Sequence, residues 1–271
     1  MNEFNLFPKF IDKAASPVAE RVGETLSSVW DIVFGNIDFY AQRKNYERQL
    51  SFESFKNMVD EKASSISSDK LQEPELYIIG PTLEASKYYF ENDVLRELFA
   101  NLIASSINTD FQTYTHPSFV DIIKQLSPLD ANVLRSFNNV SNHPIVNIHR
   151  IIGSRGFILH KNIYLKEGLC DDLPQISMSL TNLQRLGLVS TNYTNSFEDF
   201  EYNHFREHKE YKSLKEHAML SNATFEFNDD LPKDILESMP GLDNQDVILE
   251  KGIVDLTSLG SSFLKVCIES K

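Results

Sequence analysis

Aliphatic residues recur every three or four positions through the first hundred-odd residues, and this spacing limits that part of the chain to helices. The clearest run follows Ser16-Pro17, an N-cap hydroxyl and a proline at the first helical position. Trp30 and Phe34 widen its apolar stripe, so the sequence predicts a helix that docks within its own domain or against a partner molecule. The stripe consists of Val18, Val22, Leu26, Val29, Val33 and Ile37.

Further helices are expected downstream, joined by short polar connections. Proline or a small polar residue precedes several of them, as in Ser127-Pro128. We therefore expect a helical N-terminal region over residues 1–115. The predicted helical stretches are 39–66, 83–108, 118–126 and 129–137.

The second half of the chain changes character, because glycine, β-branched and aromatic residues gather in Gly153–Leu165 and indicate extended or hairpin structure. A charged insertion at about 195–222 is expected to be solvated and to contain one helix, around 205–220. The remaining predictions are a helix over 174–186, strands over 188–193, 225–227 and 247–256, and a terminal helix over 257–268.

This order of elements is typical of a winged-helix domain, in which a helix precedes an antiparallel ribbon and a last helix packs back on the first. The predicted fold is therefore mainly α with a smaller α+β part. It consists of an N-terminal helical bundle and a winged-helix-like C-terminal domain over residues 116–271. An irregular α+β domain is the alternative.

Charge and cysteine content exclude several classes of protein. The 26 basic and 39 acidic residues give a net charge of −13, which weighs against adhesion to DNA, RNA or anionic lipid. Cys170 and Cys267 are too few for a disulfide scaffold or a zinc site built on thiolates. No stretch approaches the roughly 20 apolar residues that a bilayer requires. We expect a cytoplasmic protein without a cofactor.

Four segments resemble a known family in their order and spacing. They are LRELFANLIASSIN (Leu95–Asn108), HPSFVDIIKQLSPLDANVL (His116–Leu134), LTNLQRLGLV (Leu180–Val189) and LTSLGSSFLKVC (Leu256–Cys267). With them the chain resembles the Abi-alpha, or abortive infection alpha, family of bacterial proteins from about Ala14 to Cys267. The resemblance implies a role in defence against phage. It implies no catalytic residues, and the insertion is not among the segments that carry it.

One metal-binding pattern occurs in the insertion. His204, Glu207 and His208 fit H-x-x-E-H, in which two imidazoles four residues apart on a helix hold Zn²⁺ and the glutamate activates water. The third ligand would be His217 or a later carboxylate. Because the surrounding stretch is saturated with charge, a solvated helix is the simpler interpretation, and no metal site is predicted.

Other candidate groups also have simpler structural interpretations. Arg155 and His160 have the R-x4-H spacing of a class of helical ribonucleases, but their stretch is predicted to be extended, and a hairpin with a paired histidine is the simpler interpretation. His116 is expected to pack or hydrogen-bond at a helix start. Asp171 and Asp172 are expected to enrich the approach to a helix N-terminus. No catalytic residue is therefore assigned, and the chain is interpreted as non-enzymatic.

The helix over 174–186 offers side chains that can read base edges. Residues 117–271, however, contain 15 basic and 21 acidic residues and lack a basic footprint for phosphates. The leading hypothesis is an antiphage protein that acts through a protein partner or self-association. A winged-helix DNA-binding regulator is the alternative, and a zinc hydrolase or a ribonuclease is a weaker one. The candidate interaction residues are Trp30, Phe34, Thr181, Asn182, Gln184 and Arg185.

Overall fold

The computed structural model describes residues 6–13, 16–35, 46–138, 140–226 and 244–269. The chain divides into two compact units, one formed by residues 1–138 together with 258–271 and the other by residues 139–257. The helices that the sequence grouped with the C-terminal domain, at 118–135 and after 257, belong to the first unit. The functional division at residue 115 remains a prediction.

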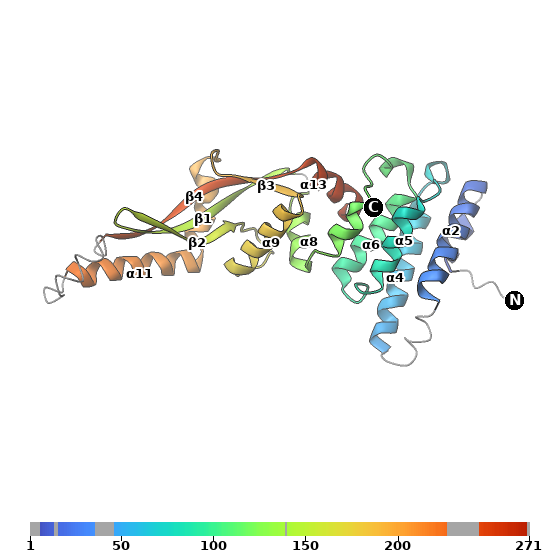
Figure 1. Ribbon diagram of the computed structural model, residues 1–271, viewed down its shortest axis with the longest axis horizontal. Coiled ribbons are helices and arrows are strands. Elements are labelled where there is room, and N and C mark those ends of the chain that lie inside the picture. Colours follow the sequence, from blue (N-terminus) through green and yellow to red (C-terminus); the bar gives the residue numbers. More distant parts are fainter. Residues whose placement is uncertain (1–5, 14–15, 36–45, 139, 227–243, 270–271) are drawn as a thin grey trace. The chain divides into compact units, whose positions relative to one another are not determined.

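The first unit is helical (Figure 1). Short 3₁₀ turns occur at Ser68–Lys70 and Thr109–Phe111. Its α-helices are α1 (Pro8–Lys13), α2 (Pro17–Phe34), α4 (Tyr46–Ser65), α5 (Leu76–Ser86), α6 (Asp93–Ser106), α7 (Ser118–Ile123), α8 (Pro128–Arg135) and α13 (Ser258–Phe263), which continues into a π-helical turn, Leu264–Ile268.

Helix α2 confirms the prediction from its apolar spacing. Ser16 caps it, with its hydroxyl accepting from the amide of Ala19. Trp30 is 2% exposed and lies among aromatic rings of α2, α4 and the segment before α1, with ring centroids 4.5–5.8 Å away. These rings belong to Phe7, Phe34, Phe52 and Phe55. Ile37 of the predicted stripe lies outside the described residues.

The single helix predicted over 83–108 is wrong. The chain forms α5 and α6 instead, because the side chain of Asn92 accepts from the amides of Val94 and Leu95 and starts a new helix there. Pro81, expected to precede the helix, lies inside α5. The N-cap at Asn92 thus divides into two helices an apolar pattern that by itself predicts one continuous helix.

Helix α6 is the buried centre of the first unit, since nearly all its residues from Leu95 onward are buried. Two of its polar side chains bind the end of the chain. Asn101 Nδ2 donates to the carbonyl of Cys267 (2.7 Å) and the Ser105 hydroxyl donates to the carbonyl of Val266 (3.0 Å). A π-helical turn widens the hydrogen-bonding interval, and these two side chains supply donors to two of its carbonyls.

The second unit is built on a four-stranded antiparallel sheet of order β2-β1-β4-β3. The central pair β1–β4 is in continuous register from Asn142↔Asp255 to Ile152↔Gln245. The extended structure predicted over Gly153–Leu165 is confirmed by β2, whose hairpin partner β1 lies wholly upstream of that range and is not predicted from the sequence. The strands are β1 (Asn142–Ile152), β2 (Arg155–Ile163), β3 (Val189–Asn192) and β4 (Gln245–Leu256).

Helix α9 (Leu173–Arg185) contacts β2 and β3, while the insertion folds back so that its helix α11 contacts β4. The insertion contains a 3₁₀ turn (Asp199–Tyr202), α10 (Asn203–Glu207) and α11 (Lys209–Glu226). The expectation of a solvated insertion is wrong, because Tyr202, Phe205 and Tyr211 are buried against Val146 and Val247 of the sheet. The strand predicted at 225–227 is also wrong as far as it is described, since Phe225 belongs to α11.

The protein is a mixed α+β protein, as the sequence predicts at the level of class. Among the described residues, no helix is long and apolar enough to cross a bilayer.

Candidate functional site

The loop between β2 and α9 forms one wall of a hollow in the second unit. Gly168 occupies the left-handed region (φ 83°) and the amide of Leu169 bonds the carbonyl of Lys166, so the loop turns sharply. It ends at Asp172, whose carboxylate accepts from the amide of Gln175 and caps α9. Asp172 thus lies at the start of a helix, as the sequence predicts, and its capping hydrogen bond is an additional finding.

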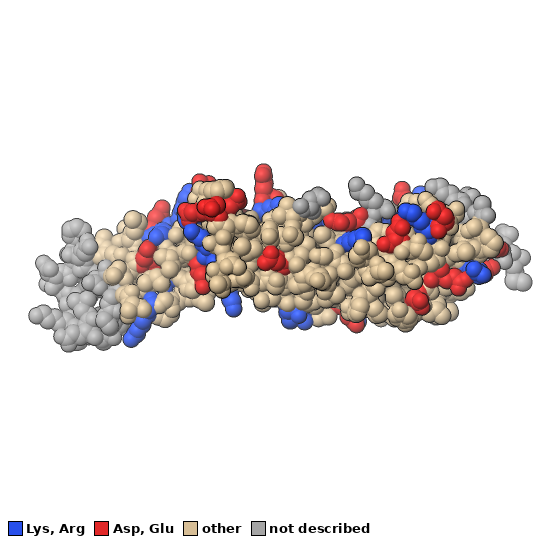
Figure 2. Space-filling view, turned by 90° about the horizontal axis from the view of Figure 1, so that it is seen from above, with Lys and Arg blue, Asp and Glu red and all other residues tan. Residues whose placement is uncertain are grey.

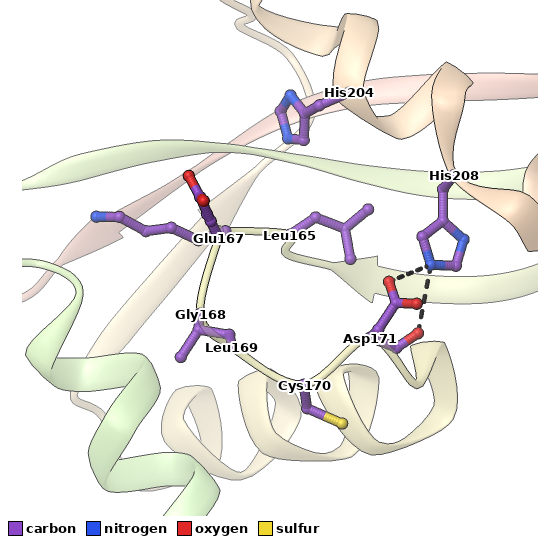
Figure 3. A pocket seen from close by; sticks show the side chains of 9 residues that line it. Leu165, Glu167, Gly168, Leu169, Cys170, Asp171, His204 and His208 are labelled. Carbon is purple, nitrogen blue, oxygen red and sulfur yellow. Dashed lines mark hydrogen bonds and ion pairs between the residues drawn. The ribbon is translucent and has the colours of Figure 1, made fainter.

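This hollow has a volume of about 460 Å³. Figure 3 shows the loop curving around it, with His204 and His208 of the insertion opposite. Its lining therefore combines two segments that lie more than thirty residues apart in the sequence. The lining residues are Leu165, Lys166, Glu167, Gly168, Leu169, Cys170, Asp171, His204 and His208.

His208 is the junction between α10 and α11, and both nitrogens of its ring are used. Its Nε2 donates to Asp171 Oδ1 (2.8 Å) and faces the carbonyl of Asp171 (3.3 Å), contacts drawn as dashed lines in Figure 3. Its Nδ1 accepts from the amide of Glu210 (3.3 Å) in the first turn of α11. Acceptance at Nδ1 places the proton on Nε2. The imidazole thus caps α11 and ties it to the loop.

Asp171, which accepts the hydrogen bond from His208, also binds a lysine. Its second oxygen, Oδ2, bonds Lys209 Nζ at 2.7 Å. The hydrogen bonds from Lys209 and then from His208 lower the pKa of Asp171 below its ordinary value of 3.8. The carboxylate is therefore ionised at neutral pH and joins the loop to the start of α11.

Replacing Asp171 with asparagine is expected to lower the stability of the protein at neutral pH and to leave it unchanged in strong acid. A carboxylate whose pKa is depressed on folding stabilises the folded state above its unfolded pKa, and this contribution is lost as the pH falls through the folded pKa. Urea unfolding of both proteins in steps from about pH 7 to about pH 2 measures the difference. Glu167→Gln, in the same loop, is the control. A difference that persists at the acid end would contradict the assignment.

His204 lies on α10 with its ring centroid 4.0 Å from that of Phe205. Burial lowers the pKa of His204 from its ordinary value of 6.5, so the ring is neutral at pH 7. The H-x-x-E-H pattern does not form one helical face, because α10 ends at Glu207 and His208 is extended (ψ 135°). No group of three His, Cys, Asp or Glu side chains within the described part of the chain is placed to hold a metal ion.

Cys170 is partly exposed in the same loop. Its sulfur accepts from the amide of Asp172 (3.4 Å) and lies 3.9 Å from Gln175 Oε1. Figure 3 shows the thiol directed toward α9 and away from both imidazoles, an arrangement unlike a cysteine–histidine nucleophile pair.

Arg155 and His160 lie on strand β2 and not on a helix. His160 Nε2 pairs with Glu210 Oε1 at 2.9 Å, which confirms the prediction of a hairpin with a paired histidine. His116 likewise bonds at a helix start, where its Nδ1 accepts from the amide of Ser118 (3.1 Å).

The candidate interaction residues fall into two groups. Trp30 and Phe34 are 2% and 1% exposed inside the first unit, in agreement with docking inside their own domain. On α9, Thr181, Gln184 and Arg185 are exposed, while Asn182 is half-buried and accepts from Arg185 Nη2 (2.8 Å). The contact of these α9 residues with any partner stays a prediction.

A polar network on the sheet was missed by sequence reasoning. Asn162 is 2% exposed and adopts φ 54° where the β1–β2 register shifts. The backbone amide of Asn162 donates to Asn147 Oδ1 (2.8 Å), and the side-chain Oδ1 of Asn162 accepts from the Tyr193 hydroxyl (2.8 Å). Asn147 and His149 both bond Glu250 Oε2 and lower the pKa of that carboxyl. The only signal in the sequence is an asparagine, which tolerates the left-handed region, inside a strand pattern.

Comparison with known proteins gives one match. The model of a family described as abortive infection alpha matches residues 47–267. No curated protein and no solved structure matches the chain.

Proposed function

Because the chain belongs to the abortive infection alpha family, we propose that it protects bacterial cells against phage by contacting another protein. The family match carries this proposal, since its residues 47–267 extend over helices of the first unit and the whole sheet of the second.

Contact, and not chemistry, is supported by what the pocket side chains already do. His208 and Asp171 join the loop to α11, and the Cys170 thiol turns toward α9. On the face shown in Figure 2, acidic and basic side chains of the described residues are interspersed, without a broad basic area. Such a surface suits a protein partner better than a phosphate backbone.

We further propose that α9, β3 and β4 act as a winged-helix-like module. These elements come in the order helix, strand and returning strand, with the insertion between the two strands. Strand β3 pairs with β4 from Val189↔Leu256 to Asn192↔Ile253. The exposed side of α9, with Thr181, Gln184 and Arg185, is the surface that such a module would offer.

A DNA-binding regulator is the second candidate, favoured by the same exposed polar side of α9. Electrophoretic shifts at low salt with duplexes that include the upstream region of the gene test it. Retention that weakens in the Gln184→Ala variant would support the regulator. Free migration of every duplex near 50 mM salt would exclude it.

Phage plating tests the leading proposal. Cells that express the chain are expected to give far fewer plaques with at least one phage of a broad panel than cells with an empty vector. The Ile32→Ala variant, altered at a side chain that is 80% exposed, should protect as well as the wild type. The Trp30→Ala variant should not protect, because it removes the centre of the aromatic cluster. Equal plaque numbers across the panel would contradict the proposal.

A further inference from the structure

Strand β2 lies at an edge of the sheet (Figure 1). It carries exposed apolar side chains. Phe157, Ile158 and Leu159 follow one another in the sequence and are between 38% and 54% exposed. Among the described strands, β2 has a neighbour on one side only, which is β1. Half of the backbone N–H and C=O groups of such a strand point outward, where another extended chain can pair with them.

The exposed side chains lie on both faces of the sheet. Phe157 is opposite Arg150 of β1, while Ile158 is opposite His149. His149 is in turn opposite Ile248 of β4, which is 42% exposed, so Ile158 and Ile248 flank it on one face. A chain added alongside β2 would place alternate side chains over both faces, whereas a flat surface would reach only one of them.

Basic side chains surround this apolar run. Arg155 begins β2 and Lys161 lies toward its end, and both are exposed. The sequence from 131 to 166 contains five basic residues and no acidic one, although the whole chain carries a net charge of −13. Strand β2 itself therefore carries two exposed cations and no carboxylate. Glu210 of α11 pairs with His160, and Arg155 and Lys161 can attract a segment of opposite charge at the outer edge.

We infer that the outer edge of β2 binds, by strand addition, an extended segment of a partner protein in which acidic residues alternate with apolar ones. The partner's backbone would pair with β2. Its apolar side chains, which share one face of the added strand, would cover Ile158, and its carboxylates would reach Arg155 and Lys161, one near each end of β2. The inference rests on the proposed function in that it names the kind of protein segment that is contacted.

A second copy of the chain fits this edge poorly. In an antiparallel β2–β2 pair that aligns all three apolar residues, Arg155 of one copy is opposite Lys161 of the other. Like charges directly opposite each other destabilise a strand pair. A partner with acidic residues at these positions turns the same geometry into two favourable contacts.

The binding test uses the purified full chain and a labelled peptide of about ten residues in which valine and glutamate alternate. A valine–lysine peptide of equal length is the comparison. Fluorescence anisotropy is expected to show at least about tenfold tighter binding of the glutamate peptide. Amide hydrogen exchange should slow in β2 and not in β3 when that peptide is bound. Equal affinity for the two peptides, or slowing elsewhere only, would overturn the inference.

A charge reversal locates the contact. The double variant Arg155→Glu, Lys161→Glu should lose the glutamate peptide by about tenfold and gain affinity for the lysine peptide. Lys212→Glu, at an exposed lysine of α11 in the same unit, should change neither affinity. An effect as large from Lys212→Glu would show that net charge governs binding and would overturn the assignment to β2.

Two further probes separate other classes of partner. Vesicles that contain phosphatidylserine and a short DNA duplex are mixed with the wild-type chain and the double variant. If the vesicles or the duplex bind only when Arg155 and Lys161 are present, and the glutamate peptide does not bind, the partner of β2 is a membrane or a nucleic acid and the inference of a protein segment is wrong. These binding measurements need no phage. A negative binding result therefore does not contradict the proposed antiphage function, and a negative plating result does not contradict the binding of a peptide to β2.

Discussion

Replacing Trp30 with alanine is expected to lower the free energy of unfolding of the first unit by about 3–5 kcal/mol. The indole is 2% exposed, and four phenylalanine rings surround it. Its removal takes away the transfer free energy of a large side chain and leaves a cavity that helices α2 and α4 do not refill. Urea unfolding, followed by circular dichroism, measures the loss.

The Ile32→Ala variant is the matched control for that experiment, because it shortens a side chain of the same helix that is 80% exposed. Its free energy of unfolding should stay within about 0.5 kcal/mol of the wild type. A Trp30→Ala protein as stable as the control would show that the aromatic cluster does not hold α2 in place.

Replacing Asn101 with alanine is expected to lower the free energy of unfolding by about 2–3 kcal/mol, although the change removes only a few atoms. Asn101 is completely buried on α6, and its Nδ2 donates to the carbonyl of Cys267 in the π-helical turn. Without this donor the buried carbonyl loses its hydrogen bond from α6, which costs more than the hydrogen bond itself contributes.

Asn138→Ala is the control, since it makes the same substitution at an exposed asparagine of the same unit. Thermal unfolding should show a clear decrease in Tm for Asn101→Ala and almost none for Asn138→Ala. The double variant Asn101→Ala, Ser105→Ala tests the coupling, because both side chains bond neighbouring carbonyls. Equal Tm values for the two single variants would refute the role given to Asn101.

Helices and strands with complete local signals could be predicted from the sequence. Ser16-Pro17 and Ser127-Pro128 mark the starts of α2 and α8, and Ser127 forms a capping box with Asp130. Strands β2 and β4 also follow from local patterns. In each of these elements the residue types that start or fill it lie close together in the sequence.

Features that depend on distant contacts could not be predicted. The charged insertion hides three buried aromatic side chains, Tyr202, Phe205 and Tyr211, among many exposed charges. The helix of the insertion is stabilised by packing on the sheet, and the residues of the sheet lie outside the local sequence pattern. His204 and His208 were identified as a pair for metal binding, yet the decisive partner of His208 is Asp171, which lies 37 residues away. Asn162 owes its left-handed backbone to a register shift that only strand pairing reveals.

The path of the chain sets the time at which the first unit can be completed. This unit consists of residues 1–138 and 258–271, and all of the second unit is translated between them. At about 5–20 residues per second, the ribosome needs on the order of ten seconds to synthesise that intervening part. During this interval α6 has no carbonyl of Val266 or Cys267 to bind. Strand β4, which the sheet also needs, ends at Leu256, just before α13 begins at Ser258. We therefore expect both units to be completed late in synthesis, so that the helices made first wait longest for their last contacts.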